Sequence, residues 1–286
     1  MKTDYKIYVN GDSHTAGDGL ADDETFPNLY TGPVPMGSTV VDRRWSDFRS
    51  EMLWNNNDLR VLYNKNNLKY VWSTKLGEYL GATVINRAVG GSCIASISTR
   101  TIADLELITS RADLPDYVLI GLTTSSRLGY YTKHVEDISH IHMWVRSAIP
   151  NFKYGGMDES YLKMFTHMWG TLSDEDFLIY FLKECLLIKN YVKNRIGRDP
   201  IFVNTCMQFS NYKVLAENSK NQWLRMLWYD LLEFDKINPS MMNQPSPEFT
   251  TGCGHYLKEN HDLFAKILAK EHFGWGDIPV DKRFKL

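Results

Sequence analysis

The stretch Tyr5-Lys6-Ile7-Tyr8-Val9-Asn10-Gly11-Asp12-Ser13-His14 has the pattern of a β-strand that runs directly into a turn. Residues 5–10 alternate as a strand does, and Gly11 ends the alternation. A serine at the end of a strand suits a strand–turn–helix nucleophile. His255 opens a predicted helix near the other end of the chain and could act as its distant general base. Gly-Asp-Ser alone is a common turn, so the hypothesis depends on Ser13 and His255 together.

The rest of the chain alternates between predicted helices and strands. Ser173 and Asp176 have the spacing of a capping box, so the strongest helix is expected at 174–196, before Gly197. Strands that alternate with helices imply right-handed crossovers and a mostly parallel sheet with helices on both faces. The fold class is therefore predicted to be α/β. The other expected elements are helices at 73–80, 94–111, 223–234 and 256–270, and strands at 82–86, 117–120 and 200–206.

Two stretches depart from this alternation. Residues 15–70 are rich in Asn, Asp, Gly and Pro, and residues 128–172 are dense in Tyr, His, Met and Trp. Both are long for connecting loops, and long insertions in compact domains usually serve function. We expect them around the carboxyl ends of the strands, where ligands bind in open α/β sheets. With no repeat or linker, residues 1–286 are expected to form one domain with two insertions.

The composition excludes several classes of protein. The 286 residues carry a formal net charge of −2, which argues against a partner of nucleic acid. No run approaches eighteen apolar residues, so no membrane span is expected. The amino-terminal Met1-Lys2-Thr3-Asp4 lacks the apolar stretch of a signal peptide, so a cytoplasmic protein is expected. The oligomeric state is left open.

The cysteines are widely spaced and show no metal-ligand pairing. Three of the four lie in apolar or strand-like runs, so free buried thiols are expected. The four are Cys93, Cys185, Cys206 and Cys253.

The motifs and their order resemble the SGNH (GDSL-type) hydrolases, a family of esterases and deacetylases. The resemblance runs from residue 5 to about residue 270 and implies a three-layer flavodoxin-like fold. The family has several short sequence motifs, or blocks, in a fixed order along the chain. Gly11-Asp12-Ser13 matches the first block, and Asn86 with Gly91 five residues later matches the second. The third block is met by Gly121-Leu122-Thr123-Thr124, and the last by His255 with its downstream spacing.

The resemblance implies a role for each matching residue. Ser13 would be the nucleophile and His255 the general base. The Ser13 N–H, the Gly91 N–H and the Thr123 hydroxyl would form the oxyanion hole. A glycine suits position 91 because a side chain would obstruct the close approach of backbone to substrate.

Two positions differ from the family pattern. Most members have an asparagine amide where this chain has Thr123, and a hydroxyl donates from a shorter side chain. Most also have an aspartate three residues before the base, where this chain has Gly252. We expect a catalytic dyad in which a backbone carbonyl or a water, rather than Glu248 or Asp262, receives the Nδ1 proton of His255. The Gly-x-Thr variant followed by Arg resembles uncharacterised bacteriophage-encoded members.

Other residues have a structural and a functional interpretation. We interpret His14 as a neighbour of the nucleophile rather than the base, and His261 as a packing or hydrogen-bonding residue of its helix. Arg127 could bind an anionic substrate group or pair with a surface carboxylate. His140 and His142 lie near Glu136 and Asp137, but residues two apart on a helix do not share a face. We therefore predict no metal, and no organic cofactor.

The leading hypothesis is a serine esterase that removes O-acetyl or short acyl groups from a carbohydrate or another small ester. The alternative is a decayed site on the same fold, in a glycan- or nucleotide-binding protein or a structural phage protein. A flavodoxin-like cofactor binder is disfavoured, because Gly11-Asp12-Ser13-His14 lacks a glycine-rich or hydroxyl-rich phosphate loop.

Overall fold

A computed structural model of the chain shows how these segments are arranged. It describes residues 5–28, 32, 34–35, 49, 51–53, 55–125, 127–131, 140–144, 163, 167, 171–205, 209–230, 249–250 and 255–275.

The centre of the molecule is a four-stranded parallel sheet in the order β3-β1-β4-β7. The first expected strand is β1 (Lys6–Asn10), flanked by β3 (Thr83–Asn86) and β4 (Tyr117–Leu122). The edge strand beyond β4 is β7 (Ile201–Asn204). All four lie within one residue or two of the expected bounds, and the α/β fold with a parallel sheet is confirmed.

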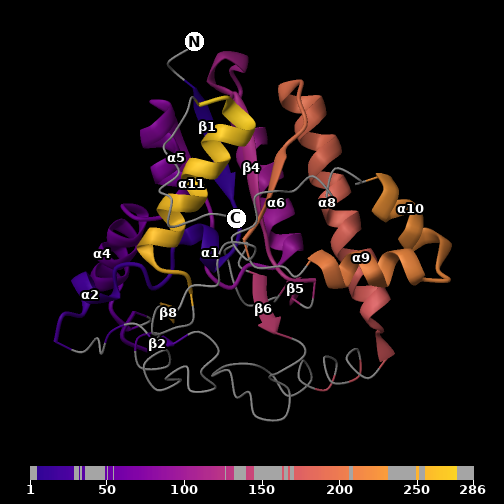
Figure 1. Ribbon diagram of the computed structural model, residues 1–286, viewed down its shortest axis with the longest axis horizontal. Coiled ribbons are helices and arrows are strands. Elements are labelled where there is room, and N and C mark those ends of the chain that lie inside the picture. The colour runs from indigo at the N-terminus through magenta and orange to yellow at the C-terminus, as the bar shows by residue number, and fades with distance from the viewer. Residues whose placement is uncertain are drawn as a thin grey trace, which may run out of the picture.

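Helices cover both faces of the sheet (Figure 1). Successive strand residues point to opposite faces, so Ile7 and Val9 pack beneath α5 (Trp72–Leu80) and α11 (Lys258–Phe273). The opposite face of β1 and β4 packs against α6 and α8, with Tyr8 and the alternate residues of β4 in that core. The bounds of these two helices are Ile94–Leu107 and Asp174–Ile196.

The expected helix ends are largely confirmed. α8 starts with a capping box between Ser173 and Asp176 and ends at Gly197 in the left-handed conformation. α5 ends at Gly81, also left-handed, as expected from a glycine after the last helical turn. α11 begins two residues later than expected and continues to Phe273.

Several elements were not expected from the sequence. α2 (Asp22–Thr25) and α4 (Asn57–Leu68) lie within the predicted insertion 15–70, whereas α1 (Ser13–Ala16) begins at the serine, where the strand–turn–helix pattern predicts a helix. α10 (Gln222–Asp230), by contrast, lies where the helix at 223–234 was expected. The remaining described elements are β2 (Val34–Pro35), the 3-10 helix Arg111–Asp113, β5 (Arg127–Tyr131), β6 (His140–Trp144), α9 (Phe209–Asn218) and β8 (Phe249–Thr250).

The hairpin of β5 and β6 corrects one premise. His140 and His142 lie on an antiparallel strand, so the argument against a metal from helical spacing was wrong about the local structure. Among the described residues, no group of three or more His, Cys, Asp or Glu is arranged to hold a metal ion. Cys93 and Cys185 are buried free thiols, as expected, while Cys206 and Cys253 lie outside the described residues.

None of the helices in the described ranges has both the length and the apolar character that crossing a bilayer requires.

The strand order places a topological switch point between β1 and β4. The chain leaves β1 and returns to β3 on one side through α5, then crosses to β4 on the other side through α6. Ligands bind outside the carboxyl ends of strands at such a point in open α/β sheets. The residues that follow these two strands are Gly11-Asp12-Ser13 and Thr123. The label of α1 marks the carboxyl end of β1 in Figure 1.

Candidate active site at the carboxyl ends of β1 and β4

Ser13 is the first residue of the short helix that follows β1. The carboxylate of Asp12 caps this helix by accepting a hydrogen bond from the His14 amide at 3.1 Å. Gly17 ends it in the left-handed conformation. Ser13 is only 6% exposed, and its own N–H belongs to the first amides of a helix, which have no intrahelical acceptor. Asp12 is therefore the capping residue of α1.

The helix α1 packs unusually closely against the backbone of β4. A Cβ atom placed on Gly121 would lie 1.9 Å from Thr15 Oγ1, and one placed on Gly11 would lie 2.3 Å from the same atom. Both contacts are far shorter than a van der Waals separation. The two glycines therefore allow α1 to sit directly on the end of β4, which brings the Ser13 turn beside the residues that follow Leu122.

Gly121→Ala should accordingly destabilise the protein by about 1–3 kcal/mol, the usual range for overpacking a dense interior. Thr15→Ala in the same chain should restore part of the loss, because it removes the hydroxyl that the new methyl group meets. Chemical denaturation of the three variants measures this. Additive losses in the double variant would show that Thr15 does not restrict position 121.

Thr123 follows β4 with its hydroxyl group unsatisfied. The residue is fully buried, and Oγ1 has no hydrogen-bond partner among the residues that the structure describes. Thr205, at the end of the neighbouring strand β7, instead donates to the Leu122 carbonyl at 3.0 Å. Buried hydroxyl groups are nearly always bonded, so an exception requires an explanation. Thr123 thus differs from an ordinary threonine at the end of a strand, whose hydroxyl would be satisfied by a neighbouring group as that of Thr205 is.

The loop after β3 is hydrogen-bonded to the helix α1. The Asn86 amide donates to the Thr15 carbonyl and to Ser73 Oγ, both at 2.9 Å, and its oxygen accepts from the Ala88 N–H at 2.9 Å. Gly91 in this loop has a φ of +76°, a conformation that residues with a Cβ rarely adopt. Glycine at position 91 is therefore required by the backbone itself.

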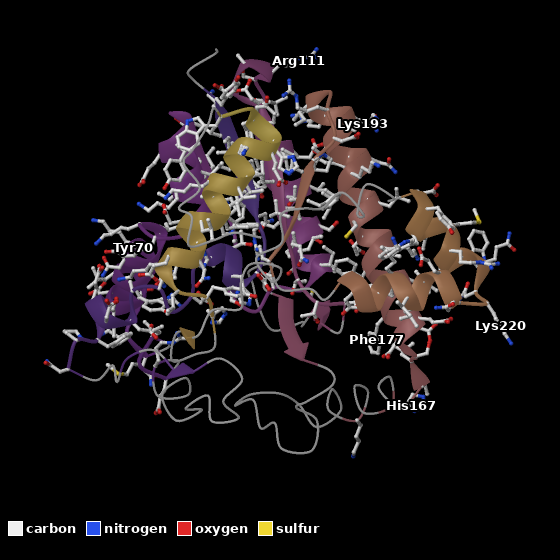
Figure 2. The ribbon with its side chains drawn as sticks, viewed as in Figure 1. Tyr70, Arg111, His167, Phe177, Lys193 and Lys220 are labelled. Carbon is white, nitrogen blue, oxygen red and sulfur yellow. The ribbon has the colours of Figure 1, made fainter. Side chains whose placement is uncertain are left out.

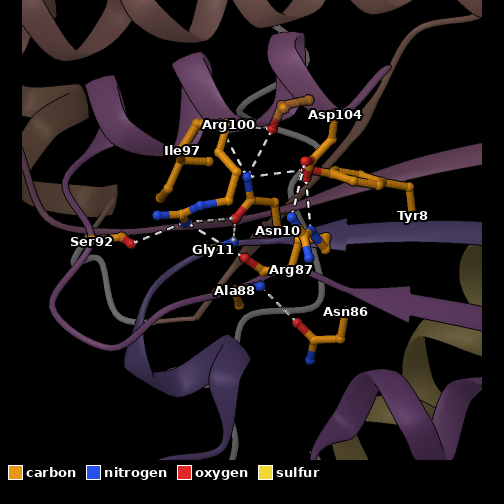
Figure 3. A network of polar contacts seen from close by, with 11 residues as sticks. Tyr8, Asn10, Gly11, Asn86, Arg87, Ala88, Ser92, Ile97, Arg100 and Asp104 are labelled. Atoms are coloured by element: carbon orange, nitrogen blue, oxygen red, sulfur yellow. Dashed lines mark hydrogen bonds and ion pairs between the residues drawn. The ribbon is translucent and has the colours of Figure 1, made fainter. Parts of the chain in front are cut away.

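A polar network beneath the site joins this loop to the serine turn (Figure 3). The Asn10 amide donates to Thr101 Oγ1 at 3.0 Å, and its oxygen accepts from the Gly11 N–H at 2.8 Å. The Arg100 guanidinium lies 3.5 Å from Asn10 Oδ1 and 3.5 Å from Ser92 Oγ. Burial lowers the pKa of Arg100. One buried group of residues thus supports the turn before Ser13 and the loop that carries Gly91.

The late histidine segment lies against the residue next to Ser13. The His14 and His255 rings are 4.6 Å apart between centroids and tilted by 52°, and the Tyr256 ring lies 5.5 Å from His14. The sequence interpretation treated His14 only as a neighbour of the nucleophile and missed this contact. Its position directly after Ser13 was the available signal, because any base that reaches Ser13 must also pass close to residue 14.

His261 is a buried neutral histidine behind this contact. Its Nδ1 accepts a hydrogen bond from the Trp72 amide at 3.2 Å, which leaves the ring proton on Nε2. Burial, followed by the nearby His14 and His255, holds the pKa of His261 well below its ordinary value. His261 therefore hydrogen-bonds as expected, although it does so across to α5 and not along its own helix.

This shift predicts a pH dependence of stability. An unfolded histidine has a pKa near about 6.5, so below that pH the unfolded chain takes up a proton that folded His261 refuses. The stabilisation is complete above about pH 6.5 and is lost as the pH falls toward the lowered folded pKa. His261→Asn keeps an acceptor for the Trp72 N–H. In this variant the free energy of unfolding should depend less steeply on pH below about pH 6.5. Urea denaturation at a series of pH values measures this dependence. If the free energy of unfolding fell equally steeply with pH in the variant and in the wild type, His261 would not be its cause.

Of the remaining predicted residues, only Asp262 can be described. It accepts a hydrogen bond from the Tyr79 hydroxyl and lies 2.7 Å from Lys266 Nζ. Its carboxylate is thus engaged on the side of α11 that faces α5. Glu248, Gly252 and the side chain of Arg127 lie outside the described residues.

Comparison with known proteins gives similarities of fold only. No protein-family profile matches the sequence, and no curated protein does. A family two carbohydrate esterase from Clostridium thermocellum, solved with cellohexaose, is similar with a TM-score of 0.47 and 13% identity over 95% of this chain and 65% of its own. This chain therefore spans slightly under two thirds of that protein's length.

Two further solved structures are similar. A family 2 carbohydrate esterase with a carbohydrate-binding domain, from Corynascus thermopiles (Myceliophthora fergusii), gives a TM-score of 0.46 and 13% identity over 95% of this chain and 66% of its own. The carbohydrate acetylesterase Est24 from Sinorhizobium meliloti gives 0.41 and 12% over 95% of this chain and all of its own.

Proposed function

We propose that the protein is a serine ester hydrolase of the SGNH type, in which Ser13 is the nucleophile and His255 the general base. The observation that supports this most strongly is the ring contact between His14 and His255. It joins the segments that the sequence hypothesis required to meet, although they lie more than two hundred residues apart. An ordinary capped turn after a strand has no need of a histidine from the far end of the chain.

In the proposed reaction, Ser13 Oγ attacks the ester carbonyl while His255 accepts its proton. Negative charge develops on the carbonyl oxygen and is stabilised by the Ser13 N–H, the Gly91 N–H and the Thr123 hydroxyl. His255 then returns the proton to the leaving alcohol as the tetrahedral intermediate collapses. Water attacks the acyl-enzyme with His255 again as base, and the acid and free Ser13 are released.

The oxyanion role explains two features of the described residues. Thr123 keeps a buried hydroxyl without a partner, which costs free energy unless another group accepts from it. Gly91 holds a left-handed backbone and presents no side chain to an approaching substrate. Both features belong to segments tied to α1, through Gly121 and through Asn86.

With glycine at position 252, we propose that the base acts in a dyad. In a triad the acid fixes the tautomer of the histidine and stabilises the imidazolium. A backbone carbonyl or a water at His255 Nδ1 would supply the first effect and less of the second. A slower enzyme than one with a full triad is therefore expected.

The substrate class comes from the sequence resemblance. We propose a short acyl ester, with O-acetyl groups on a carbohydrate favoured and Arg127 as a candidate contact for an anionic substrate group. The resemblance to bacteriophage-encoded members, and with it a place in a host cytoplasm or a virion, remains a prediction.

Hydrolysis assays test the proposal. The purified protein should release acetate from an O-acetylated oligosaccharide and cleave p-nitrophenyl acetate faster than longer acyl esters. Binding of the oligosaccharide without acetate release would instead favour a decayed site that retains a binding function.

A further inference from the structure

Lys258 occupies a position that its own helix disfavours. It is the first residue of α11, and the preceding Leu257 provides no side-chain cap. A positive charge at a helix N-terminus opposes the helix dipole. A local preference that is violated usually marks a tertiary or functional requirement.

The tertiary contacts of Lys258 lie on α2 and at the end of α4. Its Nζ is 3.1 Å and 3.2 Å from the two carboxylate oxygens of Asp23 and 3.4 Å from Glu24 Oε1. The same nitrogen lies 4.0 Å from the centroid of the Tyr70 ring. Burial would lower the pKa of Lys258, but the hydrogen bond and charge of Asp23 outweigh it and raise the pKa.

Glu24 connects these contacts into one network. It accepts a hydrogen bond from the Tyr70 hydroxyl, and its other oxygen lies 3.4 Å from Lys69 Nζ. The Tyr70 bond is the main cause of the lowered pKa of Glu24. Single exposed ion pairs contribute little, whereas several charges in a network contribute more. We call Asp23, Glu24, Tyr70 and Lys258 the Lys258 clamp; Tyr70 marks its place in Figure 2, beside α4 and the start of α11.

The clamp joins the two segments that carry the proposed catalytic residues. Asp23 follows Ser13 by ten residues, and Lys258 follows His255 by three. Between the base and Lys258, the Tyr256 ring lies against His14. The segment 255–258 is therefore attached to the nucleophile side at two points, an aromatic contact and a charged one.

We propose that Lys258 is a positioning residue, whose bonds to Asp23 and Glu24 hold His255 in register with Ser13. The inference rests on the proposed esterase function. A misplacement of about 1 Å in a catalytic group can reduce rate by a factor of about a hundred. The loss of the Lys258 bonds alone, while the contact of His14 with His255 and Tyr256 remains, should reduce the rate less, by a factor of about ten.

Lys258→Met removes the charge and keeps most of the aliphatic stem, and Lys266→Met is its matched control. Lys266 lies two turns further along α11, 2.7 Å from Asp262 and 5.7 Å from the Tyr79 ring. It is thus also paired with a carboxylate and an aromatic ring, but not with the nucleophile side. We expect kcat to fall about tenfold in Lys258→Met with KM little changed, to recover largely in Lys258→Arg, and to stay within about twofold in Lys266→Met.

Salt gives a second readout, because partly exposed ion pairs are screened as ionic strength rises. The kcat of the wild type should decrease as the NaCl concentration is raised from about 0.05 M to about 0.5 M, and the kcat of Lys258→Met should not. Equal kcat and equal salt dependence in Lys258→Met and Lys266→Met would overturn the positioning role.

Amide hydrogen exchange separates this inference from the function on which it rests. In Lys258→Met, the amides of residues 255–257 should exchange faster than in Lys266→Met, whether or not the protein hydrolyses an ester. A wild type that cleaves no ester contradicts the esterase proposal alone. Unchanged exchange in Lys258→Met contradicts the clamp alone.

Discussion

Ser13→Ala should abolish hydrolysis of a short acyl ester while the protein stays folded. The hydroxyl is the proposed nucleophile, and the other hydroxyl of α1, that of Thr15, is buried against Gly11 and Gly121. Removing a serine nucleophile leaves only the catalysis that binding and the oxyanion hole provide. Steady-state rates with p-nitrophenyl acetate measure the loss, and circular dichroism confirms the fold.

Ser219→Ala is a suitable control for this experiment. Ser219 is 5% exposed, close to the 6% of Ser13, and its hydroxyl oxygen accepts a hydrogen bond from the backbone N–H of Asn221, just before α10. Its replacement should leave kcat unchanged. Ser13→Ala combined with His255→Ala should be scarcely slower than either single variant, because nucleophile and base act as a unit. Strictly multiplicative losses would show that the two residues do not work together.

Thr123→Val should lower kcat by roughly a hundredfold, or about 3 kcal/mol of transition-state stabilisation. Valine keeps the shape of threonine and removes the hydroxyl. KM should change much less, because the proposed bond forms to the oxyanion and not to the ground-state carbonyl. Thr123 Oγ1 is buried without a partner in the described chain, so its removal should not reduce the free energy of unfolding and could raise it.

Thr205→Val is the matched variant and should behave in the opposite way. Thr205 Oγ1 donates to the Leu122 carbonyl, so valine there should cost about 1 kcal/mol of stability. Its kcat should stay close to that of the wild type. Were Thr123→Val to lose stability and keep its kcat, Thr123 would be a structural residue and the oxyanion hole would lack its side-chain donor.

The sheet and its covering helices could be predicted because their signals are local. The alternation in β1, the capping box at Ser173 and the glycines after α5 and α8 each act within a few residues. The helix α4 was missed because its many asparagines resemble a loop. Its burial of Tyr63, Asn66 and Asn67 explains why it forms: the tertiary contacts outweigh a weak local propensity.

The site was predictable only in part, for the same reason. The order of motifs along the chain suggested that Ser13 and His255 meet. The contacts that surround them join residues far apart in sequence, such as Thr15 with Gly121 and Lys258 with Asp23. Lysine at the start of α11 is an unfavourable choice for the helix alone, and a single sequence does not reveal what compensates it. Likewise, whether the Thr123 hydroxyl is satisfied depends on three-dimensional packing.

Activation of Ser13 by His255 is tested most directly by reaction of the protein with a fluorophosphonate probe. The probe labels a serine whose proton is removed by a base and spares an ordinary hydroxyl. Intact-mass and peptide analysis should find one adduct per chain, located on Ser13, with labelling slowed strongly in His255→Ala and unaffected in Lys266→Met. A wild-type protein that stays unlabelled, or one labelled at Ser13 equally fast without His255, would contradict the account.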